Sequence, residues 1–69
     1  MTDTKLLEAK INDSGLKRSH LASRLGLSSY GLQRKIQGKS EFKTGEVQAL
    51  CKELAINSEE MTLIFFAEG

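Results

Sequence analysis

Residues 18–37, with the sequence RSHLASRLGLSSYGLQRKIQ, decide the fold. Apolar residues recur every three or four positions on both sides of Gly26, which is typical of two amphipathic helices joined by a turn. Gly26 itself accepts the left-handed backbone conformation that ends a helix. Ser28 follows in the position of an N-cap, where its side-chain oxygen can accept a hydrogen bond from a free backbone N–H. We therefore expect helices at about 18–25 and 29–37.

The rest of the 69-residue chain follows the same pattern. Apolar spacing predicts three more helices at about residues 4–13, 44–54 and 58–65, with Thr44 and Ser58 as N-caps of the last two. The chain is 39% hydrophobic and 28% charged, which fits a folded domain better than a disordered segment. Because so short a chain has room for only one small core, we expect a single all-α domain over residues 1–69.

The formal net charge of +1 conceals an uneven distribution. Residues 1–43 hold nine Lys and Arg against four Asp and Glu, a net charge of +5. Residues 44–69 hold one Lys against five Glu, a net charge of −4. One basic half and one acidic half on a small domain suit an anionic partner that binds on one side only.

Residues 18–37 also meet the requirements of a helix-turn-helix that reads DNA. Such a motif needs apolar residues between its helices, a small residue where their backbones approach, a glycine in the turn and polar side chains on the outer face of the second helix. The first three requirements are met by Leu21, Leu25, Leu32, Ala22 and Gly26. The outward polar positions are Ser29, Tyr30, Gln33, Arg34 and Gln37.

Several short motifs have the spacing of a known family: Gly15-Leu16, the block LASRLGLS at residues 21–28, Leu32, and Gly38-Lys39. With these motifs the chain resembles the Cro/phage-repressor-type (lambda-repressor-like) helix-turn-helix family over about residues 4–66. The segment RKIQGKSEF at residues 34–42 is similar to a subgroup of small phage-associated regulators. The resemblance implies a compact five-helix lambda-repressor-like DNA-binding domain, and a sequence-specific transcriptional regulator whose partner is double-stranded operator DNA.

The resemblance also implies roles for individual side chains. Base edges in the major groove would be contacted by Ser28, Ser29, Tyr30, Gln33, Arg34 and Gln37. Backbone phosphates would be contacted by Lys17, Arg18, Ser19, Lys39, Ser40 and Lys43. Arg18 stands where the family commonly has Gln, and either side chain can bind a phosphate. Lys35 stands where the family usually has an apolar residue, and Ile36 is the apolar anchor instead. This leaves open whether the outward-facing positions of the second helix are shifted by one residue. Tyr30 has a second interpretation, as a cover for the edge of the core.

The C-terminal run Leu63-Ile64-Phe65-Phe66 is more apolar than so small a core can accommodate. Met61, together with Ile64 or Phe65, is expected in the core. We expect Leu63, Phe65 and Phe66 at a homodimer interface, because repressors of the resembled type often pair there. A dimer would place two reading helices about 34 Å apart, one turn of DNA, and implies a palindromic operator.

A second function class stays open: a protein-interaction module of the same fold that binds and modulates a repressor. Catalysis is not expected, since the sequence has no Ser/His/Asp set, no Gly-rich phosphate loop and no clustered metal ligands near His20. We therefore expect no cofactor, no metal and no small-molecule substrate. Cys51 is expected to be a small core residue in a reducing compartment. Without a signal-peptide pattern or an apolar stretch of about 20 residues, we expect a cytoplasmic protein with no membrane partner.

Overall fold

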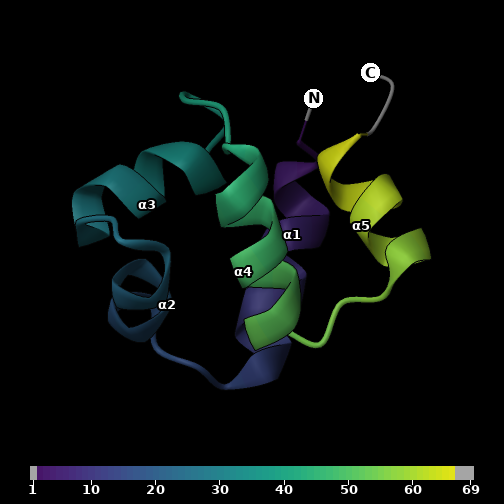
Figure 1. Cartoon of the computed structure of the whole chain (residues 1–69), viewed down its shortest axis with the longest axis horizontal. Helices are drawn as coiled ribbons and strands as arrows, with labels where there is room; N and C mark the ends of the chain where they lie inside the picture. Colours follow the sequence, from purple (N-terminus) through teal and green to yellow (C-terminus); the bar gives the residue numbers. More distant parts are fainter. Residues whose placement is uncertain (1, 67–69) are drawn as a thin grey trace.

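Five helices make up the computed structural model of the chain, which describes residues 2–66. Their bounds are α1 (Thr4–Ser14), α2 (Arg18–Leu25), α3 (Ser29–Ile36), α4 (Thr44–Glu53) and α5 (Ser58–Phe65). No strand occurs in residues 2–66. The all-α, five-helix expectation is confirmed, and each helix begins and ends within one residue of its predicted bounds. In Figure 1, α2 and α3 lie together at one side of the molecule and α5 lies at the other.

The core draws fully buried side chains from all five helices. The largest of them are Leu7, Ile11, Leu21, Leu32, Ile36, Leu50 and Ile64. Each such side chain stabilises the fold by about 1.5–3 kcal/mol relative to an exposed position, so this cluster dominates the driving force for folding. Ala22 is also buried and is the small residue of α2, which packs against both α3 and α4. α1 packs in turn against α3 and α5.

Some of the residues predicted to cap the helix ends do so in the structure, and others do not. Gly15 and Gly26 follow α1 and α2 in the left-handed conformation, each with a φ of 72°. Ser28 is the N-cap of α3, and its Oγ accepts from the Gly31 N–H at 3.0 Å. The predicted N-caps Thr44 and Ser58 are wrong, because each is the first helical residue and the N-cap is the residue before it.

The physical reason for these two corrections is the glutamate three residues after each N-cap. Glu60 Oε1 accepts from the Asn57 N–H at 3.3 Å, while the Asn57 side chain accepts from the Glu60 N–H at 2.9 Å. Glu46 Oε1 likewise accepts from the Lys43 N–H at 2.9 Å. A carboxylate that accepts the N–H of the N-cap residue fixes where the helix begins. The hydroxyl groups of Thr44 and Ser58, one position later, are then not needed as caps.

An aromatic pair joins the loop after α3 to the last helix. The rings of Phe42 and Phe65 meet edge to face, with centroids 5.5 Å apart and an angle of 85° between their planes. Phe65 is only 6% exposed, so this member of the expected dimer surface lies in the core instead. The other two members, Leu63 and Phe66, are each 61% exposed. The described part of the chain contains no helix long and apolar enough to cross a membrane.

Candidate nucleic-acid interface

The junction between α2 and α3 is closed by backbone hydrogen bonds. The Leu27 N–H donates to the Ala22 carbonyl at 2.9 Å, and the Gly26 N–H donates to the Ser23 carbonyl at 3.2 Å. This pattern satisfies the last carbonyls of α2 and requires a left-handed residue, which Gly26 supplies without steric cost. Ser28 then caps α3 at once, so the two helices are joined by a short turn of defined geometry.

Two buried side chains set the orientation of α3. Leu32 is 1% exposed and Ile36 is fully buried, and residues four apart lie on one face of a helix. The apolar anchor is therefore Ile36, as the sequence indicates, and Lys35 lies beside it rather than in its place. Of the six residues predicted to contact bases, Gln33 and Arg34 are half-buried, and the exposed ones are Ser28, Ser29, Tyr30 and Gln37. Tyr30 is 72% exposed, which argues against its role as a cover of the core.

The residues predicted to contact phosphates lie at two helix N-termini and between α3 and α4. Lys17, Ser19, Lys39 and Lys43 are exposed, and Arg18 and Ser40 are half-buried. The Nη1 atom of Arg18 is buried without a hydrogen-bond partner, so a phosphate could reach Arg18 only through its other nitrogens.

The N-termini of α2 and α4 differ from those of the other helices. Asp3, Ser28 and Asn57 accept backbone N–H groups with their side chains at α1, α3 and α5. The N-caps of α2 and α4 are Lys17 and Lys43, whose side chains carry donors and no acceptor. The N-terminus of α2 thus keeps free N–H groups next to a lysine, which is an arrangement that attracts anions. At α4 the Glu46 carboxylate already accepts the Lys43 N–H, so the N-terminus of α4 is less favourable to a second anion.

In the described part of the chain, several charged side chains outside the predicted DNA contacts form ion pairs with one another. Lys10 pairs with Glu60 and Lys35 with Glu46, while Glu53 Oε1 lies 3.0 Å from His20 Nε2 and 3.5 Å from Arg24 Nε. Three glutamates of the acidic half are therefore neutralised by basic residues of α1, α2 and α3. Within residues 2–66, the predicted DNA-contacting cations form no ion pair: Lys17, Arg18, Arg34, Lys39 and Lys43.

The pair of Lys35 and Glu46 links α3 to α4 and is the feature that sequence reasoning missed. Their side chains are 12% and 11% exposed, and Glu46 Oε1 accepts from both Lys35 Nζ and the Lys43 N–H. Burial acts to raise the pKa of Glu46, but the hydrogen bonds from Lys35 and the Lys43 backbone outweigh it and hold the pKa below its ordinary value. A glutamate three residues after Lys43 is the signal in the sequence that could have indicated its bond to the Lys43 N–H, whereas its pairing with Lys35 has no such signal.

The contact between His20 and Glu53 also lay beyond the sequence pattern, because 33 positions separate the two residues. It joins α2 to α4 beside Arg24. No group of three or more potential metal-ligating side chains is found in the described residues, and this cluster holds only one carboxylate and one imidazole.

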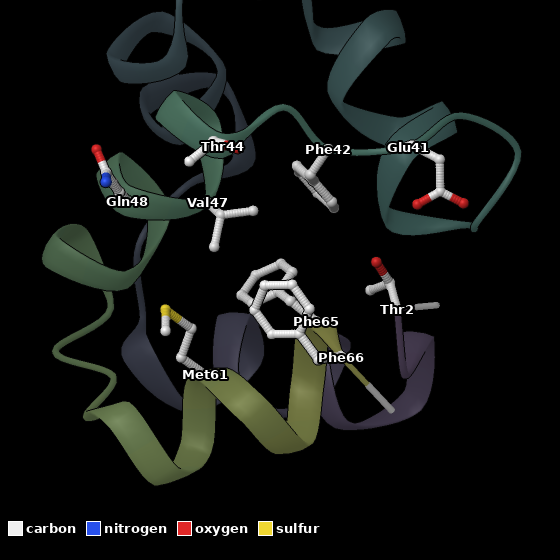
Figure 2. Close-up of a pocket in the computed structure, with 9 residues that line it drawn as sticks. All are labelled: Thr2, Glu41, Phe42, Thr44, Val47, Gln48, Met61, Phe65 and Phe66. Carbon is white, nitrogen blue, oxygen red and sulfur yellow. The ribbon is translucent and has the colours of Figure 1, made fainter. Parts of the chain in front are cut away.

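A separate hollow of about 330 Å³ lies between α4, α5 and the loop after α3. Figure 2 shows the rings of Phe42, Phe65 and Phe66 around it, with Thr2 and Glu41 at one end. Met61 and Gln48 lie toward the other end, and none of the residues predicted to contact bases lines it. The hollow is thus distinct from the outer face of α3.

Comparison with known protein families, with curated proteins and with solved structures finds no match to this chain.

Proposed function

We propose that this protein is a sequence-specific DNA-binding transcriptional regulator, in which α2, the turn at Gly26 and α3 form a helix-turn-helix. The observation that carries the proposal is the N-terminus of α2, which has no side-chain cap and no acidic residue in its first turn. It is preceded by Lys17, to which the family resemblance assigns a phosphate contact. The resemblance to Cro and phage repressors supports the same conclusion.

In this proposal α3 enters the major groove with its outer face toward the bases. Gln33 would bond adenine in bidentate fashion, and Arg34 would bond guanine or a phosphate. The N-terminus of α2 and the side chains of Lys39, Ser40 and Lys43 would bind backbone phosphates and fix the register of α3, since phosphate contacts position a protein without specifying sequence. Two copies paired through Leu63 and Phe66 would read a palindromic site, because one small module alone offers only a small interface.

Selection of bound sites from random double-stranded DNA tests the proposal, followed by affinity measurements over a range of salt concentrations. We expect an enriched sequence and a log–log salt slope that steepens by about 0.9 for each phosphate contact. Lys17→Ala and Lys43→Ala should each make the slope shallower by about that amount. Lys52→Ala is the matched control, because Lys52 is an exposed lysine at the far end of α4.

The base contacts are tested on the selected site. Gln33→Ala and Arg34→Ala should each reduce the preference for that site over random DNA by about 1–3 kcal/mol. Unchanged preference in both variants would show that α3 does not read the groove. A chain that selects no sequence and shifts no duplex at low salt would overturn the DNA-binding function.

The hollow beside Phe66 favours one other function, a module that binds and modulates a repressor protein. An exposed aromatic ring next to a hollow lined by both apolar and polar side chains is a common feature of protein-binding surfaces. This function predicts co-purification with a larger repressor, and Phe66→Ser should abolish that association while Lys43→Ala should not.

A further inference from the structure

We propose that Glu46 is a positioning residue that holds the phosphate-binding segment 37–43 in a fixed place relative to α3. The inference rests on the proposed DNA-binding function and adds to it a residue that would not contact DNA. Its basis is a single carboxylate oxygen, Glu46 Oε1, which accepts from Lys35 Nζ on α3 and from the Lys43 N–H at the start of α4.

The segment between these two donors has few other restraints. At its beginning, the Gly38 N–H donates to the Lys35 carbonyl at 3.1 Å and the Lys39 N–H donates to the Arg34 carbonyl at 2.9 Å. In the described part of the chain, residues 40–42 donate no backbone–backbone hydrogen bond. Phe42 packs against the core, but the packing of its ring does not fix the position of backbone hydrogen-bonding groups in the segment. The two bonds of Glu46 therefore close the segment at its far end.

Stability alone does not account for the ion pair. Both side chains are about nine-tenths buried, and removing two charges from water cancels much of their attraction. Two apolar side chains of similar volume often serve as well or better for folding. What the apolar pair could not do is accept the Lys43 N–H, so the specific contribution of Glu46 is the connection between α3 and the backbone at Lys43.

The consequence concerns three residues assigned to phosphate contact: Lys39, Ser40 and Lys43. Phosphates are spaced at fixed intervals along DNA, so these groups bind together only if the segment keeps its place while α3 occupies the groove. Holding the segment before DNA arrives reduces the conformational entropy lost on binding.

The test compares two double variants, K35M/E46L and K10M/E60L. Each leaves the net charge unchanged, so neither alters the overall attraction to DNA. The control is closely matched: Glu60 is also three residues after an N-cap, accepts that residue's N–H and pairs with a lysine on another helix. The pair of Lys10 and Glu60 joins α1 to α5, far from the proposed interface. Affinity for the selected duplex is measured against salt, and amide hydrogen exchange is measured in the free protein.

For K35M/E46L we expect about tenfold weaker binding to the selected duplex, because a charge-assisted hydrogen bond that orders the segment is removed. The salt slope should become shallower by about 0.9 for each phosphate that the variant no longer binds. Amides of residues 39–43 should exchange about tenfold faster while those of the core keep their protection. E46Q retains an oxygen for the Lys43 N–H and should lose less affinity than the double variant. K10M/E60L should match the wild-type chain in both binding readouts.

Wild-type affinity and an unchanged salt slope in K35M/E46L would overturn the positioning role while leaving the DNA-binding function intact. An equal loss of affinity in K10M/E60L would also overturn it, since the effect would then be general destabilisation. A wild-type chain that binds no duplex would overturn the proposed function itself. In that case unchanged exchange at residues 39–43 would further show that Glu46 does not order the segment.

Discussion

Gly26 gives the clearest prediction at the scale of a single residue. Its φ of 72° lies in the left-handed region, and a Cβ added there would meet no atom within 4 Å. Gly26→Ala should therefore destabilise the fold by about 1–2 kcal/mol through backbone strain alone. Gly45 has equal space but lies inside α4 without a positive φ, so Gly45→Ala should stabilise by up to about 0.5–1 kcal/mol. Urea unfolding of both variants measures the effect, and shifts of the same sign would contradict it.

Cys51 gives a second prediction at this scale. Its side chain packs half-buried against the core, and burial raises the pKa of the thiol. Because the thiolate is the reactive form, alkylation by iodoacetamide at neutral pH should be slower for the folded chain than for free cysteine. Concentrated urea should abolish the difference. A folded chain that reacts as fast as free cysteine would show that the thiol is exposed.

The sequence predicts individual residues well where the cause is local. Gly26 and Ser28 follow from the rules for helix ends, which depend only on neighbouring residues. The N-cap expected at Thr44 is wrong because a glutamate within the helix determines the N-cap position, and hydroxyl preference alone does not reveal it. The pairing of Glu46 with Lys35 depends on how α3 crosses α4, which is decided by core packing and lies outside any local pattern.

At the scale of elements, the contact between α3 and α4 should depend on pH. The pKa of Glu46 is lowered from its ordinary value of 4.5, so its ionised form binds its partners in the folded state. A lowered folded-state pKa contributes stability above the unfolded value of 4.5, and this contribution is lost as the pH falls through the folded value. Glu46→Gln should thus destabilise at pH 7 by about 1–2 kcal/mol and approach wild-type stability in acid.

Urea unfolding at a series of pH values measures this difference between wild type and Glu46→Gln. Glu60→Gln is the comparison, because the pKa of Glu60 is also lowered, by Lys10, while that pair is about one-third exposed. Solvent screening makes the exposed pair weaker, so its variant should show a smaller effect. A deficit in Glu46→Gln that stays constant from neutral to acid pH would contradict the ionised contact.

Helix bounds are the level at which the sequence is most informative. Amphipathic spacing predicts all five helices, since each must bury one face against the others. Which side chains at the end of α5 are buried is harder to predict from the sequence. Ile64 and Phe65 are both buried, whereas Leu63 and Phe66 are exposed. Spacing alone could not separate Phe65 from Phe66, because the edge-to-face contact with Phe42 comes from a loop.

At the scale of the whole molecule, folding brings acidic side chains of the C-terminal half against basic side chains of the N-terminal half. Glu46, Glu53 and Glu60 belong to the acidic half and pair with side chains of the basic half. The cations that remain outside ion pairs in residues 2–66 include those of the proposed interface. A net charge near zero is therefore compatible with local attraction to DNA, since the field near a surface depends on which charges are compensated.

The association of two copies is the prediction at this largest scale. Leu63 and Phe66 are three residues apart at the end of α5, and both are 61% exposed. Because burying such side chains contributes about 1.5–3 kcal/mol each, a pair of copies joined there gains from four of them.

We expect sedimentation equilibrium to show a dimer that Leu63→Ser/Phe66→Ser converts to a monomer, with little loss of folding stability. Tyr30→Ser is the control: within residues 2–66 Tyr30 is the other large exposed apolar residue, and on α3 it should affect DNA affinity without affecting association. The dimeric chain should protect two half-sites about 34 Å apart, and the monomeric variant only one. A wild-type chain that stays monomeric at concentrations that saturate its DNA site would contradict this pairing.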